Sequence, residues 1–199
     1  EILCSDIAHA LLDEAGGPVR VSGAALTPLP SDDGIIDPGQ LDRRITRRGD
    51  VHHSQPRIVS ITQSTENGRV WQPDTIAAFI DHAHELDLLV HVDGSRIANA
   101  IAALGVTPAQ AIGDADIVTV GGTKNGMLFG DAVLVRRPEH FGGIHFVQKQ
   151  IGHLASKHRF VAAQFPAMLE DGLWLETAAH ANAMAKKPSE GMVAPGLPL

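Results

Sequence analysis

Two charged residues each close an apolar run of the sequence and stand beside glycine. Asp93 follows the run 88–92 in "LLVHVDGSRIANA", and Lys124 follows the run 117–120 in "DIVTVGGTKNGMLFG". An aspartate that faces a heterocyclic nitrogen keeps this nitrogen protonated through charge pairing, and a lysine amine can form a Schiff base with an aldehyde. Together the two side chains have the chemistry to hold pyridoxal phosphate, a cofactor that acts as an electron sink.

Each of these residues, taken alone, also has a plainer explanation. An aspartate at a strand end is often a helix cap or a turn residue. A lysine in a glycine-rich turn is often only a solvated surface charge. The segment "GGTKNG" is not a phosphate-binding P-loop, because the Gly-Lys-Ser/Thr order is absent. Spacing alone therefore leaves both explanations open.

The surrounding sequence alternates strand and helix patterns, which brings these residues to one edge of a sheet. Strands are predicted at 2–4, 24–29, 57–62, 88–92, 117–120 and 132–138. Helices are predicted in "AHALLDEAGG" up to Gly16 and Gly17, from Asp37 and Pro38, from Pro73, over 95–104, and from Thr107 and Pro108. These strands are apolar nearly throughout, without the apolar–polar alternation of a half-exposed sheet, and helices separate them. This pattern predicts an α/β fold with a mostly parallel sheet flanked by helices. Ligands bind outside the carboxyl ends of such strands, where Asp93 and Lys124 fall.

The composition excludes several other classes of protein. A formal net charge of -7 argues against nucleic-acid binding, and the basic cluster "RRITRRGD" is short and followed by an acid. The sequence contains no apolar run of the roughly 18 residues needed to cross a membrane. Cys4 is the single cysteine, so the chain has no internal disulfide and suits a reducing cytoplasm.

Four segments, in order, resemble the threonine aldolase and aromatic amino acid β-eliminating lyase family. "HVDGSRIANA" resembles the family's Asp-Gly-Ala-Arg segment and "GGTKNGMLFGDAVLV" its cofactor-lysine segment, while "SITQSTENGRVW" and "CSDIAHALLDEAGGP" fall in the family's order. The resemblance covers nearly everything before about Lys187. It implies a pyridoxal phosphate enzyme of the aspartate aminotransferase fold that cleaves L-threonine, L-allo-threonine or related β-hydroxy amino acids to glycine and an aldehyde. A β-eliminating lyase and an inactive remnant of the family are the alternatives.

The resemblance also implies roles for the residues around the two strand ends. Lys124 would hold the cofactor and act in catalysis, and Asp93 would pair with the pyridine nitrogen. Arg96, three residues after Asp93, would face the cofactor or the substrate carboxylate, with a surface ion pair as the alternative. Thr123 would bond the cofactor phosphate.

Three further residues are expected at the same edge. The resemblance implies that His9 lies over the cofactor ring and acts in catalysis, although it could instead cap a helix. Thr62 and Gln63 end their strand beside the site, as cofactor contacts or as ordinary strand-end residues. Some family members carry a histidine near Gln63 that meets the substrate hydroxyl, so the base that acts on this hydroxyl stays open. No metal site is expected.

The resemblance further implies segments that this sequence does not show. These are a small-residue loop that holds the cofactor phosphate and a C-terminal domain with an arginine for the substrate carboxylate. The chain opens on a strand-like run without an initiator methionine. We therefore expect that it begins inside a larger fold and that the chain alone is a poor aldolase. The resemblance also implies a homodimer or homotetramer.

Three parts are expected along the chain. Residues 1–141 would form part of the large domain of a pyridoxal phosphate transferase-like fold. Residues 142–187 would form a helical segment of two long helices, separated near Asp171 and Gly172, and the proline-rich residues 188–199 a disordered tail.

Overall fold

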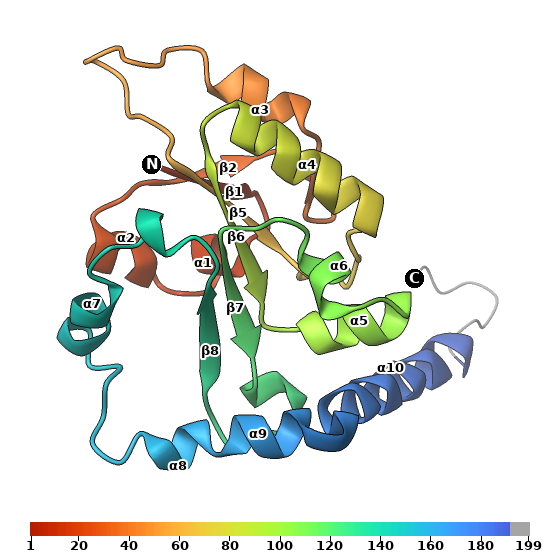
Figure 1. The fold of residues 1–199 in the computed structure, drawn as a ribbon. Coiled ribbons are helices and arrows are strands. Elements are labelled where there is room, and N and C mark those ends of the chain that lie inside the picture. The colour runs from red at the N-terminus through yellow and green to blue at the C-terminus, as the bar shows by residue number, and fades with distance from the viewer. Residues whose placement is uncertain (192–199) are drawn as a thin grey trace.

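A six-stranded sheet runs through the computed structural model, which describes residues 1–191 (Figure 1). The strands are β1 (Ile2–Ser5), β2 (Leu26–Leu29), β5 (Ile58–Thr62), β6 (Leu89–Gly94), β7 (Ile117–Gly121) and β8 (Asp131–Val135). Their order is β2-β1-β5-β6-β7-β8, and every neighbouring pair is parallel except β7 and β8. The predicted α/β fold with a mostly parallel sheet is confirmed.

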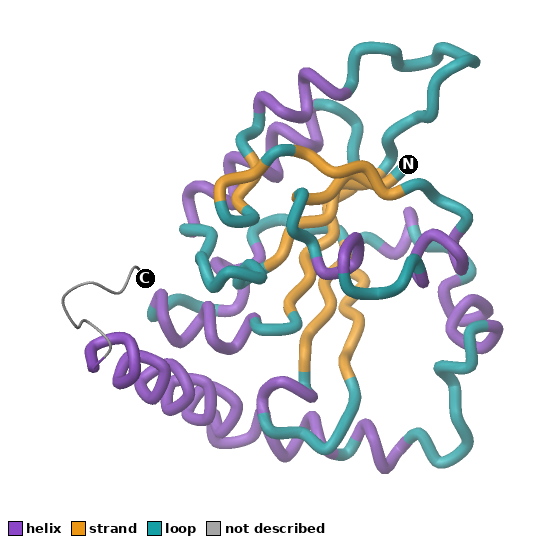
Figure 2. Tube along the Cα trace, turned by 180° about the vertical axis from the view of Figure 1, so that it is seen from behind, coloured by secondary structure: helices purple, strands orange, loops and turns teal. Residues whose placement is uncertain are grey.

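Four helices of the first two thirds of the chain cover one face of this sheet. They are α3 (Gly39–Arg44), α4 (Pro73–Glu85), α5 (Ile97–Leu104) and α6 (Pro108–Ile112), whereas α1 (His9–Leu12), α2 (Gly17–Ser22) and α7 (Ile144–Gln150) lie toward the other face (Figures 1 and 2). The hydrophobic core fills the space under the first group, with Val59, Ile61, Val90, Val92 and Val118 from the strands and Ile76, Phe79, Ile80, Ile97 and Ile101 from the helices. Burying each such large side chain stabilises the fold by about 1.5–3 kcal/mol.

Local sequence signals account for the ends of these helices. Pro73 stands at the first position of α4, where its missing N–H is not needed. Thr107 and Gln110 form a reciprocal capping box at the start of α6. Gly105 ends α5 in the left-handed conformation that glycine adopts readily. The helix starts predicted at Pro73 and Thr107 are thus found in the structure.

The last third of the chain is more broken than its sequence pattern indicates. In place of a first long helix it forms α7, α8 (Arg159–Ala162) and α9 (Gln164–Leu169), and Gly152 and Lys157 in between take positive φ angles of 81° and 63°. The predicted break before the last helix falls at Asp171 and Gly172, with φ of 56° and 74°. The helix that follows, α10 (Leu173–Gly191), packs against α5.

Several features were not predicted. The helix α2 begins at Gly17, where a helix stop was expected, and a short hairpin joins β3 (Ser31–Asp32) to β4 (Ile35–Ile36). The described part of the chain also contains the 3-10 helices η1 (Thr123–Asn125), η2 (Pro138–His140) and η3 (Glu170–Gly172). The predicted tail begins at Pro188, whereas α10 continues through Gly191. The remainder of that tail, 192–199, lies outside the described residues.

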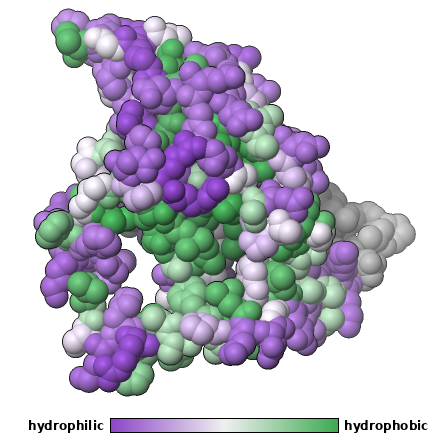
Figure 3. Space-filling model, in the orientation of Figure 1, coloured by the Kyte–Doolittle hydropathy of each residue, from purple (hydrophilic) through white to green (hydrophobic). Residues whose placement is uncertain are grey.

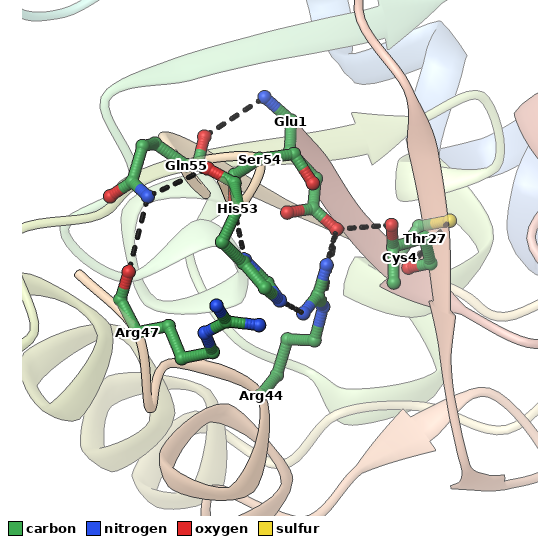
Figure 4. A network of polar contacts seen from close by, with 8 residues as sticks. All are labelled: Glu1, Cys4, Thr27, Arg44, Arg47, His53, Ser54 and Gln55. Carbon is green, nitrogen blue, oxygen red and sulfur yellow. Dashed lines mark hydrogen bonds and ion pairs between the residues drawn. The ribbon is translucent and has the colours of Figure 1, made fainter. Parts of the chain in front are cut away.

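A polar network ties the elements together at the amino ends of the strands (Figure 4). The Glu1 carboxylate accepts hydrogen bonds from Thr27 of β2 and from Arg44 of α3, and Arg44 also contacts the ring of His53 at 3.2 Å. Burial acts to raise the pKa of Glu1, but the hydrogen bonds from Thr27 and Arg44 outweigh it and hold this pKa below its usual value. The network lies at the end of the sheet opposite to Asp93.

Candidate active site

The face of the central strands that turns away from the core carries a row of polar side chains. Thr62 on β5 pairs with Asp93 on β6, and Asp93 pairs with Thr119 on β7. Two residues earlier, Ser60 pairs with His91. Because alternate residues of a strand share a face, all five side chains lie on the same side of the sheet. The row ends at the carboxyl edge, where ligands bind in folds of this class.

Asp93 uses only one of its two carboxylate oxygens within the described part of the chain. Its Oδ1 accepts hydrogen bonds from the backbone N–H of Ser95 at 2.9 Å and from the Ser95 hydroxyl at 2.6 Å. These two bonds hold the carboxylate in a fixed orientation, as in other turns that an aspartate closes. The second oxygen, Oδ2, stays available to a ligand.

Glycine allows the ends of β6 and β7 to approach each other closely. A Cβ atom on Gly121 would lie 2.3 Å from the carbonyl oxygen of Ser95, and one on Gly94 would lie 2.3 Å from that of Thr119. Any side chain at either position would push the two backbones apart. The turn that follows Asp93 is therefore in contact with the segment that leads to Lys124.

Lys124 lies in the middle of η1, directly after β7. The loop is fixed on both sides of it, since buried Asn125 donates to the carbonyl of Trp174 at 2.9 Å and Gly130 N–H donates to the Thr123 hydroxyl at 3.1 Å. The Lys124 side chain itself is exposed, and among residues 1–191 its amine has no hydrogen bond or ion pair. A fixed backbone thus presents an amine that is free to react.

Arg96 stands at the N-cap of α5, three residues after Asp93. Its guanidinium group is partly buried, and within the described residues it forms no ion pair. The alternative role of Arg96, a surface ion pair, is therefore not found among the described residues. A cation left without a partner beside Asp93 suits an anionic ligand.

His9 begins α1, just after the carboxyl end of β1. Its Nε2 lies 2.8 Å from Oε1 of Glu14 and its Nδ1 3.5 Å from Oδ2 of Asp13, so carboxylates of the following turn contact both ring nitrogens. The cap position of α1 belongs to Ala8. The imidazole is held in one orientation at the rim of the sheet.

Gln63 points into the core and not toward the polar row. Its side-chain amide donates to the carbonyls of Trp71 at 3.0 Å and Ala111 at 3.2 Å, and its Oε1 accepts from Trp71 N–H at 3.1 Å. Successive strand residues face opposite sides, so Gln63 and Thr62 cannot both meet the same ligand. The geometry gives no support to the expectation that Gln63 contacts the cofactor, because the hydrogen bonds of its side chain are made inside the fold.

Glu66 was not singled out from the sequence, yet it joins two of the expected residues. Its Oε1 accepts hydrogen bonds from the backbone N–H of His9 at 2.9 Å and from the Thr62 hydroxyl at 3.0 Å. Its Oε2 is buried and has no hydrogen-bond partner among the described residues. The available signal was an acid four residues after Thr62 in "SITQSTENGRVW".

His91 lies below Asp93 in the polar row. One ring nitrogen is 2.8 Å from the Ser60 hydroxyl and the other 3.5 Å from the Thr119 hydroxyl. Burial lowers the pKa of His91 from its usual 6.5, and the charge of Asp93 opposes this shift only in part. The imidazole is therefore neutral near neutral pH.

Residues 1–191 contain neither a candidate metal cluster nor a candidate membrane-spanning helix. No cluster of three or more histidine, cysteine, aspartate or glutamate side chains there could hold a metal ion. None of the described helices combines the length and apolar character needed to cross a membrane.

A family model and two threonine aldolases of Pseudomonas indicate the family to which the chain belongs. A family model described as beta-eliminating lyase matches residues 1–198. The low specificity L-threonine aldolase of a Pseudomonas species is 42% identical over 188 residues, covering 93% of this chain and 54% of that protein. The corresponding enzyme of Pseudomonas aeruginosa is 39% identical, covering 95% of this chain and 56% of its own length. The chain therefore spans about half the length of these relatives.

Solved structures show the same fold. The threonine aldolase of Leishmania major superimposes with a TM-score of 0.90 at 24% identity, over 96% of this chain and 56% of that chain. A pyridoxal phosphate-bound C-S lyase of Staphylococcus hominis superimposes with a TM-score of 0.58 at 16% identity, over 96% of this chain and 48% of its own. At these identities the likeness concerns the fold alone.

Proposed function

The chain belongs to the beta-eliminating lyase family, and from this premise we propose that it carries the cofactor-binding residues of a lyase of the L-threonine aldolase type. Its substrates would be L-threonine, L-allo-threonine or related β-hydroxy amino acids, and its products glycine and an aldehyde. The observation that carries the proposal is the pair formed by Asp93 and Lys124. They lie at the carboxyl ends of neighbouring parallel strands, each with a functional atom left without a partner among the described residues.

The residues at this edge fit pyridoxal phosphate. Asp93 offers Oδ2 to the pyridine nitrogen, and Lys124 offers an amine to the aldehyde carbon. The Thr123 hydroxyl accepts from Gly130 and can still donate its own proton to a phosphate oxygen. When bound, the cofactor supplies an electron sink for bonds that break at the substrate α-carbon.

Each remaining side chain has a definite task. Ser95 holds the Asp93 carboxylate in place, so that its negative charge stays where a positive ring nitrogen needs it. Arg96 would bind the substrate carboxylate, which fixes the amino acid against rotation. His9, contacted by Glu14 and Asp13, would lie over one face of the cofactor's pyridine ring.

We further propose that the protein works as a homo-oligomer.

The proposal is tested by locating the lysine that holds the cofactor. The full chain is incubated with pyridoxal phosphate, reduced with borohydride, digested and mapped by mass spectrometry. We expect the reduced adduct on Lys124, and its loss in Lys124→Ala but not in Lys149→Ala, a second lysine of the chain. Release of acetaldehyde from L-threonine and L-allo-threonine is then followed with the same three proteins. An adduct confined to another lysine would contradict the proposal.

A further inference from the structure

Glu66 occupies the point where two segments of the candidate site meet. It follows β5, and its Oε1 binds both the hydroxyl at the end of that strand, on Thr62, and the backbone N–H of His9 after β1. Thr62 is the register partner of Asp93 on the polar face. The Glu66 carboxylate therefore lies one strand away from the aspartate that we assign to the cofactor.

The second oxygen of this carboxylate lacks the partner that buried polar atoms usually have. Oε2 of Glu66 is buried, and no donor within residues 1–191 reaches it. Native proteins leave few buried oxygens in this state, because an unmade hydrogen bond to a desolvated group costs stability. A donor that arrives with a ligand would satisfy it.

We propose that Glu66 is the catalytic base that accepts the proton of the substrate's β-hydroxyl group, an inference that rests on the proposed function. As the O–H bond breaks, its proton passes to Glu66, and its electron pair forms the C=O bond of the departing aldehyde. The Cα–Cβ bond breaks at the same time, and its electron pair remains with the α-carbon of the glycine unit. This carbon later takes up a proton to give glycine, which balances the reaction.

The other groups at this edge are committed elsewhere. Both ring nitrogens of His9 contact carboxylates, and the Thr62 hydroxyl already donates to Glu66. Asp93 is bound to Ser95 and assigned to the cofactor. Glu66 also lies close to the Cys4 thiol, whose pKa is raised to about 11 first by burial and then by the carboxylates of Glu66 and Asp6. A carboxylate with a buried oxygen that no donor of the described residues reaches is suited to accept a proton from a ligand.

The test separates hydroxyl deprotonation from all other steps by using glycine, which has no hydroxyl. In the full chain loaded with pyridoxal phosphate, glycine binding is measured by absorbance, and exchange of its α-proton in deuterium oxide by NMR. Glu66→Gln should bind glycine and exchange its proton as the unaltered protein does. It should cleave L-threonine at least about 100-fold more slowly, the usual range for a lost acid–base group. Added formate should restore part of the cleavage in Glu66→Ala.

Asp6→Asn is the matched control. Asp6 is an exposed carboxylate of the same rim, its side chain binds Ser31, and it also raises the pKa of Cys4. Both Glu66→Gln and Asp6→Asn should lower the pKa of this single cysteine in the cofactor-free protein, but only Glu66→Gln should lose cleavage. If Asp6→Asn lowers the pKa of the Cys4 thiol but Glu66→Gln leaves it unchanged, Glu66 carries no charge, and the inference is overturned.

The kinetic outcomes are equally decisive. Normal cleavage by Glu66→Gln, or loss of glycine exchange together with cleavage and no rescue by formate, would show that Glu66 only supports the fold. If the unaltered protein neither forms the reducible adduct at Lys124 nor exchanges the glycine proton, the proposed function falls, and this inference falls with it. If the unaltered protein exchanges the glycine proton and Glu66→Gln cleaves L-threonine at the normal rate, the inference about Glu66 is overturned but the proposed function is not.

Discussion

Asp93 is both a turn residue and a candidate ligand, because its two carboxylate oxygens have different surroundings. Oδ1 closes the turn with Ser95, and Oδ2 has no partner among the described residues. The two explanations that the sequence leaves open for this aspartate are therefore compatible. The same division occurs in Glu66, where one oxygen joins two segments and the other is unpaired. At the scale of single residues, the site is built from carboxylates that are only half used by the fold.

Replacing Asp93 by asparagine should separate the two tasks of this side chain. The amide oxygen can still accept the hydrogen bonds from Ser95, so the free energy of unfolding should change little. The lost negative charge should reduce turnover by about 100-fold or more, the scale seen when a preorganised electrostatic partner is removed. Steady-state kinetics and urea unfolding check the two parts. Ser95→Ala, which keeps the charge, should lose less activity; equal turnover by Asp93→Asn and the unaltered protein would contradict the assignment.

His91 should make stability depend on pH. Its pKa in the folded protein lies below 6.5, the usual value of an unfolded histidine, so below that pH the unfolded chain binds more protons than the folded one. Stability therefore falls as the pH drops through about 6.5 and continues to fall until the folded pKa is reached. His91→Gln should flatten this part of the curve in urea titrations, whereas His52→Gln, at an exposed loop position, should not. Equal slopes for His91→Gln and the unaltered chain would count against the lowered pKa of His91.

At the scale of elements, the sequence predicted what depends on local signals and missed what depends on tertiary contacts. The strands before Asp93 and Lys124 were predictable because continuous apolar runs mark buried parallel strands. The face to which Gln63 points was not, since it depends on which side α4 and α6 cover. Glu66 was missed because its partners come from β5 and from the start of α1, which are far apart in the sequence.

The 3-10 helix that carries Lys124 depends on α10 for its position. Asn125 donates to the Trp174 carbonyl at 2.9 Å, so Asn125→Ala should leave that carbonyl without its donor and cost about 1–2 kcal/mol of stability. The loosened loop should also slow the formation of the borohydride-reducible adduct at Lys124. Asn182→Ala is the matched control, because Asn182 joins α10 to Asn99 of α5, away from the lysine. Asn182→Ala should lower stability by a comparable amount but leave adduct formation at its normal rate. If adduct formation slows equally in Asn125→Ala and Asn182→Ala, the positioning role of Asn125 is refuted.

At the scale of the whole molecule, exposed apolar side chains gather around one edge of the sheet and the helices that follow it. Within residues 1–191, β8 pairs with β7 alone. Large apolar side chains around β8 and in the helices that follow are exposed, among them Leu128 (81%), Phe129 (54%), Val133 (53%), Phe146 (73%) and Phe160 (63%). Figure 3 shows apolar surface gathered in the middle of the face turned to the viewer, with polar surface above it. Extended apolar patches of this kind mark surfaces that contact other protein.

We therefore expect the 199-residue chain to associate with itself as its concentration rises, through the apolar residues of α7 and α8. Each exposed phenylalanine that becomes buried at such a contact should contribute about 2 kcal/mol, so Phe146→Ser and Phe160→Ser should each weaken association by at least roughly tenfold. Sedimentation velocity over a range of concentrations measures this change. Val51→Ser is the control, because Val51 is 93% exposed in the loop before β5, far along the chain from these helices. Its substitution should leave association unchanged, since a single apolar residue on a polar loop offers no extended surface. A chain that stays monomeric at every concentration, or a Val51→Ser variant as impaired as the phenylalanine variants, would show that this surface is not the contact.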